Sequence, residues 1–134
     1  MLRCLIVDDS PPFISAATRL LERQGITVLG AASTSAEALQ LTTTLRPDVV
    51  LVDIDLGGES GFELARQVER AGASPPPVIL ISSHAEEDYA DLLADNPAIG
   101  FLPKTILSAT AIRDLLDGRG PHVSARPVSG PPGT

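Results

Sequence analysis

Short apolar runs alternate with longer amphipathic segments along most of the chain. Some of these runs are nearly continuous in Val, Ile and Leu, which is typical of strands that are covered on both faces. The predicted strands are residues 2–7, 27–32, 49–53, 78–82 and 99–103. Segments with apolar residues three and four apart predict helices at residues 11–24, 35–45, 61–71, 86–95 and 106–117.

Start and stop signals support these helices. Ser10, followed by proline, is a good cap for the first helix, and Gly25 ends it. Ser35 with the nearby Glu37, and Asn96 before a proline, mark other helix boundaries. Strand and helix in alternation indicate an α/β fold, in which right-handed crossovers join parallel strands and place helices on both faces of one sheet.

Composition limits the classes of function. At 134 residues the chain is expected to form one domain. A net charge of −7 argues against binding to nucleic acid or to anionic lipid. There is neither a leader-like start nor an apolar run of membrane-spanning length, and the single cysteine, Cys4, lies within an apolar strand pattern. We therefore expect a cytoplasmic protein without a membrane segment.

The end of the chain has a different composition. Residues 118–134 are dominated by Gly, Pro and Ser and contain almost no large apolar residue. We expect residues 1–117 to form the domain and residues 118–134 to be either a disordered tail or a truncated linker to a further domain.

Chemically active side chains follow the predicted strands. Asp8 and Asp9 come after the first strand, Asp53 ends the third, Ser82 ends the fourth, and Lys104 follows the fifth. The carboxyl ends of parallel strands meet at one edge of such a sheet, where ligands bind. Lys104 is also the only lysine of the chain, so a compact ammonium can be supplied only there.

These residue types predict phosphoryl transfer. Asp8, Asp9 and Asp53 would repel one another strongly unless a cation lay between them, and oxygen ligands with open positions suit Mg²⁺. A carboxylate can attack phosphorus to give an aspartyl phosphate. Lys104 would supply a second cation, and Ser82 a hydroxyl donor, for the phosphoryl oxygens.

Each of these residues also has a structural explanation when it is taken alone. An acidic pair such as Asp8 and Asp9 stabilises a helix N-terminus, and Asp53 before a glycine-rich loop can start a turn. Ser82 can cap a helix, and a lone lysine such as Lys104 usually lies on the surface. Their combination at the ends of successive strands favours a functional site.

Residues 2–117 resemble the receiver domains of two-component response regulators. The resemblance rests on the order and spacing of the acidic pair after Val7, the strand-end Asp53, Gly61 after the loop, and a hydroxyl, an aromatic and a lysine further on. These last three are Ser82, Phe101 and Lys104. The family's fold is a doubly wound, flavodoxin-like sheet of five parallel strands in the order 2-1-3-4-5, with five helices.

The resemblance also implies roles for these residues. Asp53 would accept a phosphoryl group from a sensor histidine kinase or a phosphotransfer protein. Asp8, Asp9, Asp53 and the backbone carbonyl of Asp55 would bind Mg²⁺, and Ser82 and Lys104 would hold the phosphoryl oxygens. Such a domain catalyses only its own phosphorylation and dephosphorylation.

A switch and a partner surface are implied as well. The Ser82 hydroxyl would move onto the phosphoryl group and leave room for Phe101 to turn inward. The signal would change a surface of the fourth helix, fifth strand and fifth helix that is also a candidate homodimer interface. That surface would include Tyr89, Leu92, Phe101 and Leu107. Asp55 and His84 would tune the lifetime of the phosphate.

The chain departs from the family pattern at two loops. Gly57 stands where many relatives have proline, which predicts a less rigid loop after Asp53. Thr105 follows Lys104 where proline is frequent, and this leaves the isomer of that peptide bond open.

Parts of this pattern also occur in other classes of protein. Asp53 and Asp55 after an apolar strand also resemble the first motif of haloacid-dehalogenase phosphatases, but the acidic pair comes too early in the chain for that family. A receiver that is never phosphorylated and serves only as an interaction module is the main alternative. The segment 101–105 also resembles receivers attached to DNA-binding domains, and this suggests a role in transcription regulation.

Overall fold

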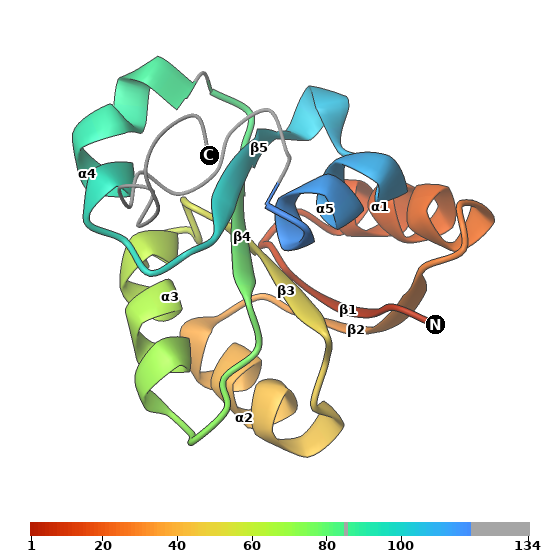
Figure 1. Cartoon of the computed structure of the whole chain (residues 1–134), viewed down its shortest axis with the longest axis horizontal. Coiled ribbons are helices and arrows are strands. Elements are labelled where there is room, and N and C mark those ends of the chain that lie inside the picture. The colour runs from red at the N-terminus through yellow and green to blue at the C-terminus, as the bar shows by residue number, and fades with distance from the viewer. Residues whose placement is uncertain (85, 119–134) are drawn as a thin grey trace, which may run out of the picture.

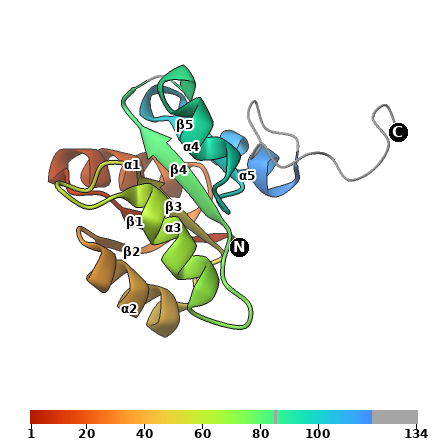
Figure 2. The same cartoon turned by 90° about the vertical axis from the view of Figure 1, so that its left-hand side faces the viewer.

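The computed structural model describes residues 1–84 and 86–118, and its core is a parallel sheet (Figures 1 and 2). The strands lie in the order β2-β1-β3-β4-β5, as expected for the flavodoxin-like fold. Their bounds are β1 Arg3–Val7, β2 Thr27–Ala32, β3 Val49–Asp53, β4 Val78–Ser82 and β5 Gly100–Pro103. Each predicted strand is therefore present, with its ends moved by one residue at most.

The helices cover both faces of this sheet. Their bounds are α1 Pro11–Arg23, α2 Ser35–Leu45, α3 Gly61–Arg70, α4 Ala90–Ala94 and α5 Ala109–Leu116. In Figure 1, α1 and α5 lie on one face, and α2, α3 and α4 on the other. Short 3₁₀ turns, η1 Glu86–Tyr89 and η2 Lys104–Ile106, precede α4 and α5.

Successive side chains of each strand point to opposite faces of the sheet, and they form an apolar core on each face. On the side of α1 and α5, Ile6, Leu51 and Ile81 pack with Leu21 and Ile112. On the other side, side chains of the same strands pack with α2 and α3. Period-two alternation with both faces apolar explains why β3 and β4 read as continuous hydrophobic runs.

Two predicted helices are wrong in part. The segment predicted as one helix over residues 86–95 is divided between η1 and the single-turn helix α4. The helix predicted over residues 106–117 begins at Ala109, because the Ser108 hydroxyl accepts a hydrogen bond from the N–H of Ala111 and so caps the helix there.

One predicted cap is shifted by one residue. Thr34, not Ser35, caps α2, with its hydroxyl accepting from the N–H of Glu37 at 3.2 Å. The Glu37 carboxylate in turn accepts from the N–H of Ser33, the residue before the cap, at 3.0 Å, which ties the start of the helix to the preceding chain. The predicted cap Ser10 and the predicted stop at Gly25, whose φ is 91°, are both present.

Other expectations concern single features of the chain. Within residues 1–84 and 86–118, no helix combines the length and apolar character that crossing a bilayer requires. All peptide bonds of this described part are trans, including the bond between Lys104 and Thr105. The predicted disordered tail lies, from residue 119 onward, outside the described residues.

Candidate functional site

Three strand ends meet at one edge of the sheet. Asp8 follows β1, Asp53 is the last residue of β3, and Lys104 follows β5 directly. The ammonium Nζ of Lys104 lies 2.8 Å from Oδ2 of Asp8 and 3.2 Å from Oδ2 of Asp53. The convergence predicted from the strand pattern is therefore present for these residues.

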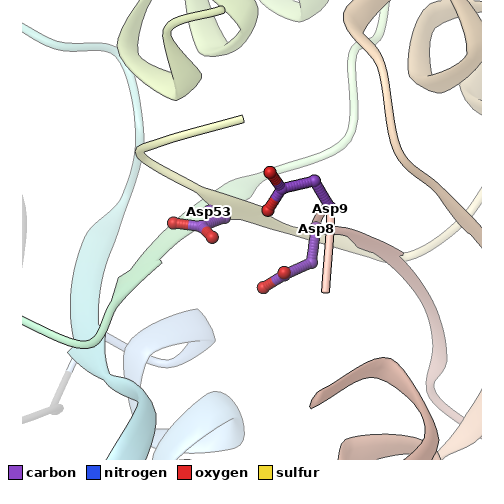
Figure 3. A group of neighbouring side chains, drawn as sticks. All are labelled: Asp8, Asp9 and Asp53. Atoms are coloured by element: carbon purple, nitrogen blue, oxygen red, sulfur yellow. The ribbon is translucent and has the colours of Figure 1, made fainter. Parts of the chain in front are cut away.

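Asp9 completes an acidic cluster with Asp8 and Asp53. One carboxylate oxygen from each residue lies within 4.8 Å of the others, and Figure 3 shows the three carboxyl groups extending toward the same side. Asp8 is fully buried and Asp53 is 7% exposed, whereas Asp9 is exposed. The cluster is therefore accessible to solvent on the side of Asp9.

The two oxygens of Asp8 have different surroundings. Oδ1 accepts a hydrogen bond from the N–H of Ser10 at 2.8 Å. Oδ2 forms the close ion pair with the ammonium of Lys104. A buried carboxylate needs such a cationic partner, because burial disfavours an unpaired charge.

Burial and charge act against each other on the two central groups. Burial raises the pKa of Asp53 above its usual range, and the charge of Asp8 adds to this, whereas the hydrogen bond from Asp55 and the ammonium of Lys104 oppose it. Burial alone would lower the pKa of Lys104, but its contacts with Asp8 and Asp53 outweigh burial and raise it. Lys104 therefore stays charged, whereas burial disfavours the ionised form of Asp53.

The loop after β3 is ordered around Asp53. The N–H of Asp55 donates to Oδ1 of Asp53 at 3.0 Å, and Asp55 pairs with Ser60 in an isolated antiparallel bridge. The hydrogen bonds of this bridge join Leu56 to Glu59 and Gly61 to Ile54, so neither of them uses the Asp55 carbonyl. That carbonyl oxygen is consistent with the predicted role as a metal ligand.

Two glycines allow this loop to approach the acids. Gly57 has a φ of 64°, and a Cβ there would lie 2.7 Å from Oδ2 of Asp9. A Cβ on Gly61 would lie 2.2 Å from the backbone oxygen of Asp53, so only glycine lets α3 begin against β3. Proline cannot adopt a positive φ, so proline would not fit position 57 in this loop.

Ser82 is the last residue of β4, the strand next to β3, and His84 follows it by two residues. Ser82 is buried, and it follows Ile81, which pairs with Asp53 in the β3–β4 ladder. Its hydroxyl accepts a hydrogen bond from the N–H of His84 at 2.9 Å. His84 itself is exposed, with its ring 6.3 Å from that of Tyr89.

The expected partner surface is wrong for two of its residues. Phe101 is fully buried and Leu107 is 7% exposed, because their side chains belong to the two apolar cores. Leu92, at 52% exposure, does lie on the surface, and Tyr89 is partly buried. Ile106, which the sequence did not single out, is 48% exposed on η2, which directly follows β5.

An aromatic contact at Lys104 was not predicted. The Nζ atom of Lys104 lies 4.3 Å from the centre of the Phe13 ring, which comes from the first turn of α1. An aromatic residue a few positions after an acidic pair does not by itself indicate a contact with a distant lysine. Nothing in the pattern indicated that this ring would face a lysine from the other end of the domain.

Comparison with known proteins places the fold and site in context. A profile of the response regulator receiver domain matches residues 4–117. The transcriptional regulatory protein LiaR of Bacillus subtilis is 33% identical over 110 residues, which are 81% of this chain and 52% of LiaR. The chain thus spans about half the length of the curated relatives it matches.

Solved structures agree with the sequence matches. The receiver domain of the response regulator NarL from Mycobacterium tuberculosis is 32% identical, with a TM-score of 0.75 over 88% of this chain and 95% of that one. A response regulator from Burkholderia pseudomallei, solved with a phosphorylated aspartic acid, a calcium ion and citrate, is 25% identical. Its TM-score is 0.73 over 87% of this chain and 66% of that one.

Proposed function

Because the chain belongs to the response regulator receiver domain family, we propose that Asp53 accepts a phosphoryl group in a two-component signalling pathway. The observation that carries this proposal is the contact of Lys104 with both Asp8 and Asp53 at the edge of the sheet. The donor is a phosphohistidine of a sensor histidine kinase or phosphotransfer protein.

The transfer itself needs little covalent chemistry from the protein. A carboxylate oxygen of Asp53 forms a bond to phosphorus while the bond from phosphorus to the histidine nitrogen breaks, and that imidazole nitrogen recovers a proton. The ammonium of Lys104 neutralises charge on the phosphoryl oxygens, and the Ser82 hydroxyl donates a hydrogen bond to one of them. For this, the Ser82 hydroxyl turns its proton toward the phosphoryl group.

The acidic cluster fits Mg²⁺. The donors are all oxygen atoms, one carboxylate oxygen from each of Asp8, Asp9 and Asp53 lies within 4.8 Å of the others, and Asp9 is exposed to solvent. Asp8, Asp9, Asp53 and the carbonyl of Asp55 would hold the ion, which when bound offsets negative charge during transfer. The calcium ion and phosphorylated aspartic acid of the Burkholderia relative support this assignment.

The output of the domain is binding to a partner. The Ser82 hydroxyl and Phe101, whose ring is already turned inward in this structure, form the switch. Asp55 and His84 tune the lifetime of the phosphate. The exposed side chain of Leu92 on α4 belongs to the surface that meets the partner or a second copy. The protein acts in the cytoplasm and catalyses no reaction beyond its own phosphorylation and dephosphorylation. Similarity to LiaR supports transcription regulation as the downstream role, with DNA contacted by another domain or protein.

The test is labelling by a small phosphodonor. The protein is incubated with Mg²⁺ and phosphoramidate, and its intact mass is measured beside that of Asp53→Asn. We expect the wild type alone to gain one phosphoryl group. A folded wild type that binds Mg²⁺ and gains none would indicate the silent interaction module, and multiple turnover of phosphate esters would indicate a phosphatase.

A further inference from the structure

Phe13 places an aromatic face under the ammonium of the only lysine in the chain. The Phe13 ring is partly buried, and the Nζ atom of Lys104 lies 4.3 Å from its centre. This distance is within the range of cation–π attraction, which is stronger where water is excluded. The side chain of Lys104 is 16% exposed, so most of it is removed from water.

The position of the ring is fixed by a closed series of contacts. The N–H of Ser10 donates to Oδ1 of Asp8, and the Ser10 hydroxyl accepts from the N–H of Phe13 at 3.4 Å. The Phe13 ring contacts the ammonium of Lys104, and this ammonium forms the ion pair with Oδ2 of Asp8, which closes the series. The cap of α1 and the acidic site are thus one structural unit.

The ammonium is held from different directions. Asp8 and Asp53 attract it from the ends of β1 and β3, while the ring of Phe13 covers it from α1. An ammonium group on a four-carbon stem would otherwise sample many positions, because lysine loses considerable rotamer freedom when it is held. The ring limits these positions without competing with the carboxylates for a hydrogen bond.

We propose that Phe13 is a positioning residue, whose aromatic face holds the Lys104 ammonium over Asp53 for phosphoryl transfer. This inference rests on the proposed function. When Asp53 becomes an acyl phosphate, its charge moves outward to the phosphoryl oxygens, and Lys104 must follow them. The ring remains in contact during this movement, because its attraction does not depend on the carboxylate of Asp53.

The contact can be observed directly because Lys104 is the only lysine. Lysine labelled with ¹³C at Cε gives one side-chain NMR signal, and the adjacent aromatic ring shifts its attached protons. We expect Phe13→Leu to remove this ring-current shift and Phe13→Tyr to retain it. Ile14→Ala, which shortens a neighbouring side chain of α1 in the same core, controls for general loosening of the helix.

The functional measurement is the rate of labelling by phosphoramidate with saturating Mg²⁺. We expect Phe13→Leu to be slower than wild type by about threefold to tenfold, as loss of a partly buried cation–π contact implies. Phe13→Tyr should restore most of the rate, and Ile14→Ala should leave it unchanged. Leucine keeps the apolar character of Phe13 but lacks the aromatic face. A purely structural role of Phe13 would therefore not make Phe13→Leu slower than both Phe13→Tyr and Ile14→Ala.

The outcomes separate this inference from the proposed function. If the wild type is labelled and Phe13→Leu is labelled equally fast, or if the Lys104 signal is the same in both, the positioning role is overturned and the receiver function stands. If the wild type gains no phosphoryl group, the proposed function is overturned, and the inference with it.

Discussion

Asp53 is a charged group in a place that disfavours its charge. It is 7% exposed, and burial raises its pKa, so the folded state binds a proton at this carboxyl more tightly than the unfolded chain does. The ionised form therefore lowers the free energy of unfolding at all pH values above the usual aspartate pKa of about 3.9. A carboxylate in such a place is consistent with the proposed role of Asp53 as the phosphoacceptor.

We predict that Asp53→Asn is more stable than wild type at pH 7 without Mg²⁺, by about 0.5 to 2 kcal/mol. The amide oxygen can still accept the hydrogen bond from Asp55, while the charge is lost. The gain should shrink as the pH falls below the raised pKa of Asp53 and vanish below that of the unfolded chain, where both states are protonated. Urea denaturation over this pH range measures it.

Asp91→Asn is the matched control for this prediction. Asp91 is exposed on α4, and its substitution changes the net charge by the same amount as Asp53→Asn does. We expect little effect from it. Equal stabilisation by both variants would mean that overall charge, and not the burial of Asp53, is responsible.

Gly57 supports a second prediction at the scale of single residues. Gly57→Ala places a methyl group 2.7 Å from Oδ2 of Asp9, so the carboxylate must move away from the cluster. We expect Mg²⁺ to bind about tenfold more weakly, as is typical when a group that orients a metal ligand is lost. Calorimetric titration with Mg²⁺ measures this.

Gly58→Ala provides the comparison. Gly58 also has a positive φ, 107°, but nothing lies within 4 Å of its added Cβ. Both variants should lose stability from backbone strain. If Gly58→Ala weakens Mg²⁺ binding as much as Gly57→Ala does, loop strain explains the effect and displacement of Asp9 does not.

At the scale of elements, the junction of β3 and α3 positions the carboxylate of Asp53. The N–H of Gly61 donates to the carbonyl of Ile54, and Ser60 caps α3 by accepting from the N–H of Glu63. The helix therefore begins directly against the end of the strand. Any side chain at position 61 must push the two elements apart.

We predict that Gly61→Ala lowers the free energy of unfolding by about 1 to 3 kcal/mol, the usual range for overpacking. Its Cβ would lie 2.2 Å from the backbone oxygen of Asp53, which cannot rotate away as a side chain can. Gly72→Ala, where nothing lies within 4 Å, should be nearly neutral in the same urea titration. Equal effects in the two variants would contradict the close approach of α3 to β3.

At the scale of the whole molecule, charge determines what the domain can bind. The chain has a net charge of −7, and its acidic cluster concentrates negative potential at one edge of the sheet. This favours divalent cations and disfavours polyanions. Binding to the folded state alone should also stabilise it.

We predict that Mg²⁺ raises the stability of the wild type by about 2.7 kcal/mol at one hundred times its dissociation constant. Asp8→Asn should lose most of this gain, because it removes the negative charge of one of the three carboxylates in the acidic cluster. Thermal unfolding with and without Mg²⁺ measures both proteins. An equal rise in the two would place the cation elsewhere.

Much of the fold and part of the site followed from the sequence. Because strand residues alternate between two covered faces, the runs around Leu51 and Leu80 are apolar throughout, and this local signal identified β1, β3 and β4. Weaker apolar runs identified β2 and β5. Asp8, Asp53 and Lys104 were predicted to meet because parallel strands end at one edge. Their contacts confirm it.

Tertiary structure alone decided the rest. The cap at Ser108 and the division of the fourth helix depend on which backbone groups find partners, and apolar spacing does not report this. The burial of Phe101 and Leu107 depends on packing against distant elements, as does the contact of Phe13 with Lys104. The sequence by itself determined the sheet, the ends of its strands and the acids and lysine placed there, because these are periodic, local signals. Only the folded chain determined which side chains are exposed and which ring meets the lysine, since these follow from distances between residues far apart in the sequence.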